Sequence, residues 1–151
     1  MIWPEKRSMA KVVIDANIII SSAFGGIPLE ATVKAIGAHE VYLSVEIEAE
    51  LRGVFSRLSK KLTEERQTFV GEKITELIGM ASLVSIIKQI VLSRDAKDDH
   101  YLSLCKEVGA DFLITGDKDL LDIPHSALTK KGIRTRIVSP REFLEEVKSV
   151  S

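Results

Sequence analysis

The stretch from Lys11 to Ile20 reads KVVIDANIII, and it decides the fold class. Apolar β-branched residues fill most of it, which is typical of a strand buried on both faces of a parallel sheet. Asp15 nevertheless stands in the middle, with Asn17 two residues later. A lone ionised carboxylate in such surroundings costs several kcal/mol unless something compensates its charge. Because the interior of a strand offers no helix to cap, the sequence predicts a special task for Asp15.

Length and composition fit one globular domain. The chain has 151 residues, of which 45% are hydrophobic, enough to bury a core without disulfides. Its single cysteine, Cys105, leaves no disulfide within the chain and no thiolate zinc site. We expect one domain over residues 9–151, with residues 1–8 as an N-terminal leader or extension. Since the sequence offers neither a membrane-spanning run nor a secretory signal, we expect a cytoplasmic protein with no membrane partner.

Apolar periodicity predicts strands that alternate with helices. The expected strands cover residues 11–15, 40–44, 82–87, 111–115 and 134–138. The expected helices cover residues 28–38, 45–58, 63–80 and 98–108, and a last helix begins at Pro140. Ser44 is placed to cap the second helix, and Gly109 to close the fourth. We therefore predict an α/β fold, a three-layer α/β/α arrangement around a mainly parallel central sheet.

Carboxylates from separate parts of the chain fall at one end of this sheet. The working site of a parallel sheet lies beyond the C-terminal ends of its strands. Acidic residues adjoin those ends at Asp15, Glu46, Glu48, Glu50, Asp95, Asp98, Asp99, Asp117 and Asp119. Like charges a few ångströms apart repel one another unless a cation or shared protons lie between them. Because the donors are hard oxygens, with no His at zinc spacing, the pattern favours Mg²⁺ or Mn²⁺.

Ordinary structural roles compete with ligation at several of these positions. Asp95, Asp98 and Asp99 could simply cap the helix that they begin, because carboxylates stabilise helix N-termini. The stretch GDKDL at 116–120 could be only a turn, with Asp119 as one of its residues. The combination nevertheless favours a site, since several independent segments place carboxylates at the same end of the sheet.

Helical spacing ranks the neighbouring carboxylates. Asp98 precedes the apolar stripe that starts at Tyr101 by one helical turn, so it should point inward at the end of the sheet. Asp99 is rotated away from that stripe and ranks second. By the same spacing Glu50 lies one turn before an apolar residue of its own helix. Glu50 is therefore the first candidate for the site on that helix, and Glu46 is the second.

Four stretches together resemble the PIN domain, a nuclease fold found in many bacterial and archaeal toxins of the VapC type. They read VVIDANIIISS, LSVEIEAELRGVFSR, RDAKDDHYLSLCKEVGADFLITGDKDLL and IVSPREFLEEV. The resemblance implies an acidic set at Asp15, Glu50, Asp98 and Asp117. It matches Asn17, Ser44 and Thr115 to the polar residues that support that set, and Asp99 and Asp119 are added as candidate supports. The bulky run after Asp98 departs from the typical toxin pattern, in which small residues follow.

The same resemblance implies a metal-dependent endoribonuclease that hydrolyses single-stranded RNA. Asp15, Asp98 and Asp117 would be the metal ligands, with Glu50 on a second ion or acting through water, and Mg²⁺ or Mn²⁺ as cofactor. Positive charge for the substrate could come from Arg52, Arg57 and Lys118, and also from Lys60, Lys61, Lys130 and Lys131. The implied partners are RNA, a second copy of the chain in a homodimer or larger assembly, and an antitoxin protein if the chain is a toxin. The helix over 63–80 also carries apolar residues beyond what one sheet face needs.

Two alternatives remain open from the sequence. A phosphohydrolase of the haloacid dehalogenase type would use Asp15 as a nucleophile, but that family usually has a second Asp two residues later, where this chain has Asn17. A non-catalytic RNA- or protein-binding module on the same fold is the other alternative. Retention of all four carboxylates argues for metal binding and leaves turnover open.

Overall fold

Five parallel strands form a single sheet in the order β3-β2-β1-β4-β5. The computed structural model describes residues 9–86, 88–92 and 96–148. The strands are β1 (Lys11–Ile14), β2 (Glu40–Ser44), β3 (Ser82–Val84), β4 (Phe112–Ile114) and β5 (Arg136–Val138). Every neighbouring pair runs parallel, and Ile14 pairs in register with Ile114 in the centre of the sheet. The predicted parallel α/β fold is therefore confirmed.

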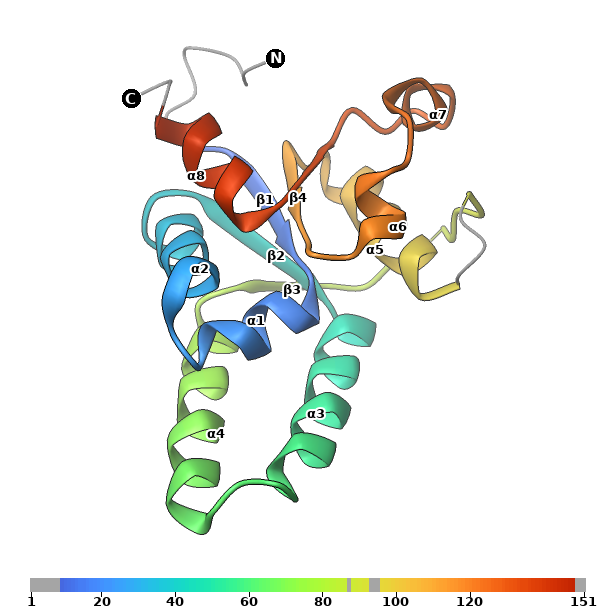
Figure 1. The fold of residues 1–151 in the computed structure, drawn as a ribbon. Coiled ribbons are helices and arrows are strands. Elements are labelled where there is room, and N and C mark those ends of the chain that lie inside the picture. The colour runs from blue at the N-terminus through green and yellow to red at the C-terminus, as the bar shows by residue number, and fades with distance from the viewer. Residues whose placement is uncertain (1–8, 87, 93–95, 149–151) are drawn as a thin grey trace.

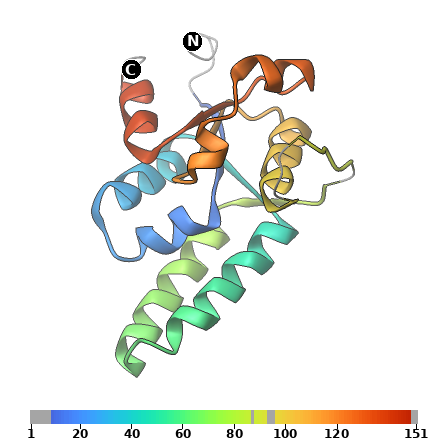
Figure 2. The same ribbon diagram turned by 45° about the vertical axis from the view of Figure 1, so that its right-hand side comes forward.

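Helices cover both faces of the sheet. They are α1 (Ala16–Ser22), α2 (Gly26–Ala38), α3 (Val45–Ser59), α4 (Glu64–Gly79), α5 (Ala96–Val108), α6 (Lys118–Leu121), α7 (His125–Lys130) and α8 (Pro140–Lys148). Figures 1 and 2 show α2 and α8 on one side of the sheet and α5 on the other. Helices α3 and α4 form a hairpin that projects from the body of the molecule. The predicted three-layer α/β/α arrangement is confirmed.

The largest difference from the sequence prediction lies at the opening stretch. The first strand ends at Ile14, and Asp15 is the N-cap of α1, a helix that the sequence analysis did not predict. The assumption that Asp15 has no helix to cap was therefore wrong. The cause is that α1 buries Ile18, Ile19 and Ile20 together and exposes only Asn17 and Ser21, so its apolar run reads like a strand.

Other boundaries differ by smaller amounts. Helix α2 begins at Gly26 rather than Pro28, and α5 begins at Ala96 rather than Asp98. The short helices α6 and α7 were not predicted at all. Strand β3 ends at Val84, and residue 87, the expected end of that strand, lies outside the described residues, as do Asp95 and residues 1–8. The predicted caps are confirmed where they can be seen: Ser44 Oγ accepts from the Ile47 backbone at 3.0 Å.

The apolar residues of α4 serve the chain's own core. Val70 and Ile74 are buried, and Leu77 and Ile78 pack against the core, so of the helix's expected apolar surplus only Phe69, 47% exposed, faces solvent. The surplus that the sequence suggested is therefore much smaller than expected. Among the described residues no single helix is long and apolar enough to cross a membrane, and only α1 with α2, bent by 109°, passes that test as a pair, by length and composition alone.

A buried histidine joins the start of β1 to the end of α2. His39 Nδ1 accepts a hydrogen bond from the Ala10 backbone at 2.9 Å, and its ring meets Phe143 edge-on with centroids 5.9 Å apart. Burial, and then the positive charge of Lys34, lower the pKa of His39, while Asp111 opposes them. The neutral ring is the form that accepts from Ala10, so protonation of Nδ1 would break this contact.

We expect His39 to make the fold sensitive to mild acid. Because its folded pKa is lowered, its contribution to stability is present above its unfolded pKa of about 6.5 and is lost as the pH falls through the lower folded value. His39→Asn keeps an acceptor at the same position without titrating near neutral pH. Urea unfolding from about pH 7.5 to 5 should therefore show a smaller loss of unfolding free energy in the variant than in wild type. Equal losses in the two proteins would contradict this role.

Candidate active site

Asp15 lies where β1 passes into α1, and three hydrogen bonds compensate its charge. Its Oδ1 accepts from the Asn17 backbone at 3.0 Å and faces the Tyr101 hydroxyl at 3.3 Å. Its Oδ2 accepts from Thr115 Oγ1 at 2.6 Å. The side chain is only 4% exposed, and a carboxylate is well placed at the positive end of a helix dipole. These contacts explain how a carboxylate is tolerated within an apolar stretch.

Tyr101 links the Asp15 region to α3. The backbone N–H of Ala16 donates to the Tyr101 oxygen at 3.0 Å, and the hydroxyl lies 3.0 Å from Glu50 Oε1. Burial, and then the charge of Asp15, raise the pKa of Tyr101 far above its usual value, so the hydroxyl keeps its proton. Since a hydroxyl has one proton, it donates to Glu50 or to Asp15 at any moment.

Asp98, Asp117 and Asp119 form a second acidic group beside Asp15. Their carboxylates each offer an oxygen, and these oxygens lie within 4.8 Å of one another. Asp98 is buried at the start of α5, while Asp117 caps α6 and its Oδ1 accepts from the Asp119 backbone at 2.9 Å. Thr115 joins the two groups, because its Oγ1 donates to Asp15 and accepts from the Asp117 backbone at 3.0 Å.

This donor set suits a divalent cation. Three converging carboxylates repel one another, and a cation between them would relieve the repulsion. All the donors are hard oxygens, and Asp117 and Asp119 are open enough to solvent for an ion to keep some of its water. These features suit a hard divalent cation and differ from those of a closed zinc site.

Comparison with known proteins identifies the family of this chain. A family model described as the PIN domain matches residues 11–119, which include every carboxylate of the site. The chain belongs to the PIN domain family. Among solved structures, PAE2754 from Pyrobaculum aerophilum has a similar fold, with a TM-score of 0.60, 10% identity, and coverage of 95% of this chain and 94% of that chain. No curated protein sequence matches the chain.

The structure brings together most, but not all, of the residues that the sequence singled out in this PIN domain. Asp15, Glu50 and Thr115 share one hydrogen-bond network with Tyr101, and Thr115 connects it to Asp117. Asp98 meets Asp117 and Asp119, so Asp119, treated above as a candidate support or a turn residue, lies within the acidic group itself.

The other expected supports contact the backbone. Ser44 is fully buried and caps α3. Asp99 Oδ1 accepts from the Leu92 backbone at 3.0 Å, which fastens the segment before α5. Asn17 contributes its backbone N–H to Asp15, while the residue is exposed.

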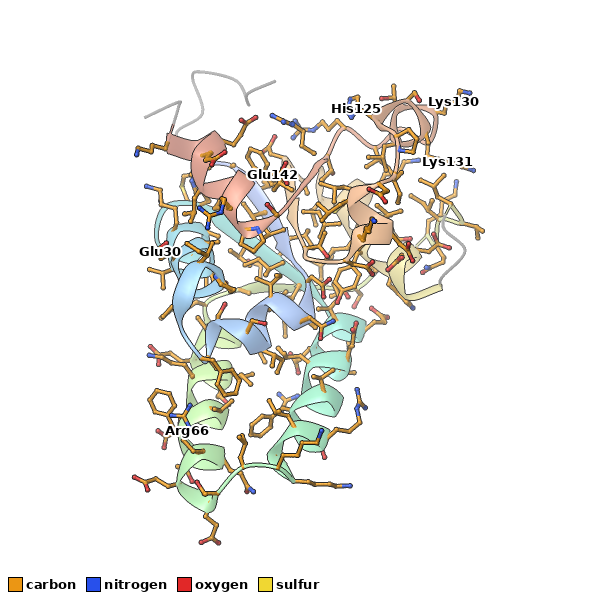
Figure 3. All side chains as sticks on the ribbon, in the orientation of Figure 1. Glu30, Arg66, His125, Lys130, Lys131 and Glu142 are labelled. Carbon is orange, nitrogen blue, oxygen red and sulfur yellow. The ribbon has the colours of Figure 1, made fainter. Side chains whose placement is uncertain are left out.

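The candidate cations for substrate binding differ in their surroundings. Arg52 pairs with Glu48 on its own helix, with Nη2 and Oε1 3.1 Å apart. Lys118 is exposed directly after Asp117, and Arg57 is exposed two turns along α3 from Glu50. Lys130 and Lys131 lie at α7, away from the first turns of α1 and α3 (Figure 3).

Sequence reasoning missed the role of Tyr101. Its place in the apolar stripe Tyr101, Leu102, Cys105 and Val108 predicted a core residue. The ring is indeed in the core, and only 3% of the residue is exposed. The available signal was its position: Tyr101 follows Asp98 by three residues, so its hydroxyl extends toward the same end of the sheet. A buried tyrosine hydroxyl normally finds a polar partner, and the nearest polar groups there are the carboxylates.

We expect Tyr101→Phe to destabilise the fold by about 1–3 kcal/mol. The change leaves the Ala16 N–H without its acceptor and Glu50 without its donor, and an unsatisfied buried group costs that much. Tyr42→Phe is the matched control, because the Tyr42 hydroxyl makes only an exposed contact with Glu40 at 3.3 Å. Urea unfolding of the two variants against wild type measures the difference, and equal small effects would refute the proposed bridge.

Proposed function

We propose that this PIN domain is a divalent-metal-dependent endoribonuclease that hydrolyses phosphodiester bonds in single-stranded RNA. The observation that supports it is the convergence of Asp98, Asp117 and Asp119 beside Asp15 at the C-terminal end of a parallel sheet. A carboxylate group of this kind would repel a phosphodiester by itself. With a cation held between the carboxylates the local field reverses, and the same group attracts the substrate.

The chain's own residues divide the work in this proposal. Asp98, Asp117 and Asp119 hold the ion, with Asp15 beside them, oriented by Thr115. Glu50, held by Tyr101, is placed to accept a proton from an attacking water or to hold a second ion. A bound Mg²⁺ or Mn²⁺ supplies positive charge that polarises the phosphodiester and acidifies water. Thr115 and Tyr101 keep the carboxylates fixed, so little reorganisation is needed during reaction.

Metal-dependent cleavage of RNA by purified protein tests the proposal directly. We expect single-stranded RNA to be cut in Mg²⁺ or Mn²⁺ and to remain intact in EDTA. Asp15→Asn, Asp98→Asn and Asp117→Asn should each lower the rate by roughly a hundredfold or more, the scale seen when one electrostatic group is removed from an active site. Asp122→Asn, a nearby exposed change at the end of α6, should leave the rate unchanged.

Thermal melts of the same proteins separate metal binding from turnover. Saturating Mn²⁺ should stabilise wild type and Asp122→Asn, by about 2.7 kcal/mol at a hundred times the dissociation constant, and should not stabilise Asp117→Asn. In EDTA the Asp117→Asn protein should be as stable as wild type or more so, because Asn also caps a helix well and one repelling charge is gone. A chain that binds Mn²⁺ without cutting RNA would be the non-catalytic module, and a chain that cuts RNA in EDTA would exclude the metal mechanism.

Membership of the PIN family removes the haloacid dehalogenase alternative.

Self-association and a toxin role extend the proposal. Phe24 and Phe69 are about half exposed and flank Arg66, whose guanidinium lies 5.8 and 5.3 Å from the two ring centroids. We propose that a second copy of the chain covers this exposed apolar surface in a homodimer. Light scattering at micromolar concentration should give twice the chain mass, and a monomeric mass would contradict the homodimer.

A toxin would in addition form a stable complex with an antitoxin encoded beside its gene, which co-expression of the two proteins detects.

A further inference from the structure

A cavity shares Glu50 with the hydrogen-bond network of the candidate active site. Its volume is about 380 Å³, and it is lined from α3 by Glu46, Ile47, Ala49, Glu50, Gly53 and Arg57 and from α5 by His100. This is large enough for a small ligand. Because Glu50 is both a wall of the cavity and a partner of Tyr101, a ligand in the cavity would lie next to the carboxylates.

The two ends of the cavity differ in charge. Glu46 and Glu50 line the cavity from the first part of α3, and Arg57 lies seven residues after Glu50 on the same helix, about 10 Å along its axis. Within the part of the chain that the structure describes, Arg57 makes no ion pair, in contrast to Arg52 with Glu48. The cavity therefore offers an unpaired guanidinium at a distance from the metal ligands, which suits a second phosphate of the same strand.

The other wall carries a polar atom that lacks a partner. His100 Nδ1 is buried and, among the described residues, has no hydrogen-bond partner. Leaving such an atom unpaired costs free energy that a ligand with a complementary polar group would recover. On the α3 wall the small residues Ala49 and Gly53 leave space in the cavity. A Cβ added at Gly53 would meet only the Arg57 guanidinium within 4 Å, at 3.7 Å.

We propose that this cavity binds one nucleotide of the single-stranded RNA substrate, adjacent to the bond that is cut, with its phosphate on Arg57 and its nucleoside between α3 and His100. The proposal rests on the proposed function, since the metal centre defines the neighbouring phosphate. It assigns Arg57 and the small residue at 53 to substrate binding rather than to metal binding or to the fold.

Binding of RNA, measured without cleavage, tests the role of Arg57. The probe is a short fluorescein-labelled single-stranded RNA with phosphorothioate linkages, followed by anisotropy in Mn²⁺ and in EDTA. Arg57→Gln should weaken binding about tenfold, the effect of losing one charge-assisted hydrogen bond, and should reduce the salt slope by about 0.7, the value for one phosphate contact. Arg57→Lys should keep the slope, and Arg141→Gln, an equal charge change on α8, should bind like wild type.

Filling the cavity provides the second arm. Gly53→Met should place a side chain in the cavity and weaken RNA binding by a similar factor, while its melting temperature should equal or exceed that of wild type, because Gly is the poorer helix former. Gly37→Met is the matched control on α2, where a Cβ meets nothing within 4 Å, and it should bind RNA normally. All five substituted proteins should retain stabilisation by Mn²⁺.

The outcomes distinguish this proposal from the nuclease proposal. Weaker binding in both Arg57→Gln and Gly53→Met, with intact stabilisation by Mn²⁺, supports the nucleotide site even if the protein proves not to cut RNA. If RNA binding were weaker in Arg57→Gln but unchanged in Gly53→Met, Arg57 would act only as a general surface charge. That result would overturn the proposal that the cavity binds a nucleotide. Unchanged binding in both variants, in a protein that cuts RNA with metal, would overturn the nucleotide site and leave the nuclease standing.

Discussion

The hydrogen bond from Thr115 Oγ1 to Asp15 Oδ2, 2.6 Å long, is the contact on which the rest of the site depends. It joins the ends of the two central strands, whose backbones also meet where the Asp15 N–H donates to the Ile114 carbonyl. A buried carboxylate is tolerated only when donors surround it. The pairing of β1 with β4 supplies one such donor, and the start of α1 supplies another. The fold therefore creates the conditions in which Asp15 can remain charged.

One neutral hydroxyl group, that of Tyr101, organises the acidic pocket around that contact. The Tyr101 hydroxyl keeps its proton and offers it to Asp15 and Glu50, while its oxygen satisfies the Ala16 N–H. The residue thus connects three segments without adding charge to a region that is already strongly negative. A lysine or arginine could bridge the same carboxylates, but its charge would compete with a cation for them.

Much of this arrangement could be read from the sequence, and the parts that could not share a physical cause. The alternation of strands and helices, the strand over residues 40–44 and the inward direction of Asp98 follow from periodicity, which local sequence carries. In helix α1 the helical periodicity is obscured, because Ile18, Ile19 and Ile20 are all buried and only Asn17 and Ser21 are exposed. The tasks of Tyr101 and the gathering of Asp119 with Asp98 depend on contacts between segments that are distant in the chain, and a pattern within one segment does not contain them.

The separation of Asp15 and Thr115 by 100 residues has a consequence for synthesis of the chain. A growing chain that ends before β4 contains the first carboxylate and all of α3, but it has neither the neighbouring central strand nor the residues that gather around Asp98. Parallel pairing over such a distance is slow, because a long loop must close before the contact is made. The acidic centre is consequently among the last features to assemble, and an unfinished chain does not yet contain it.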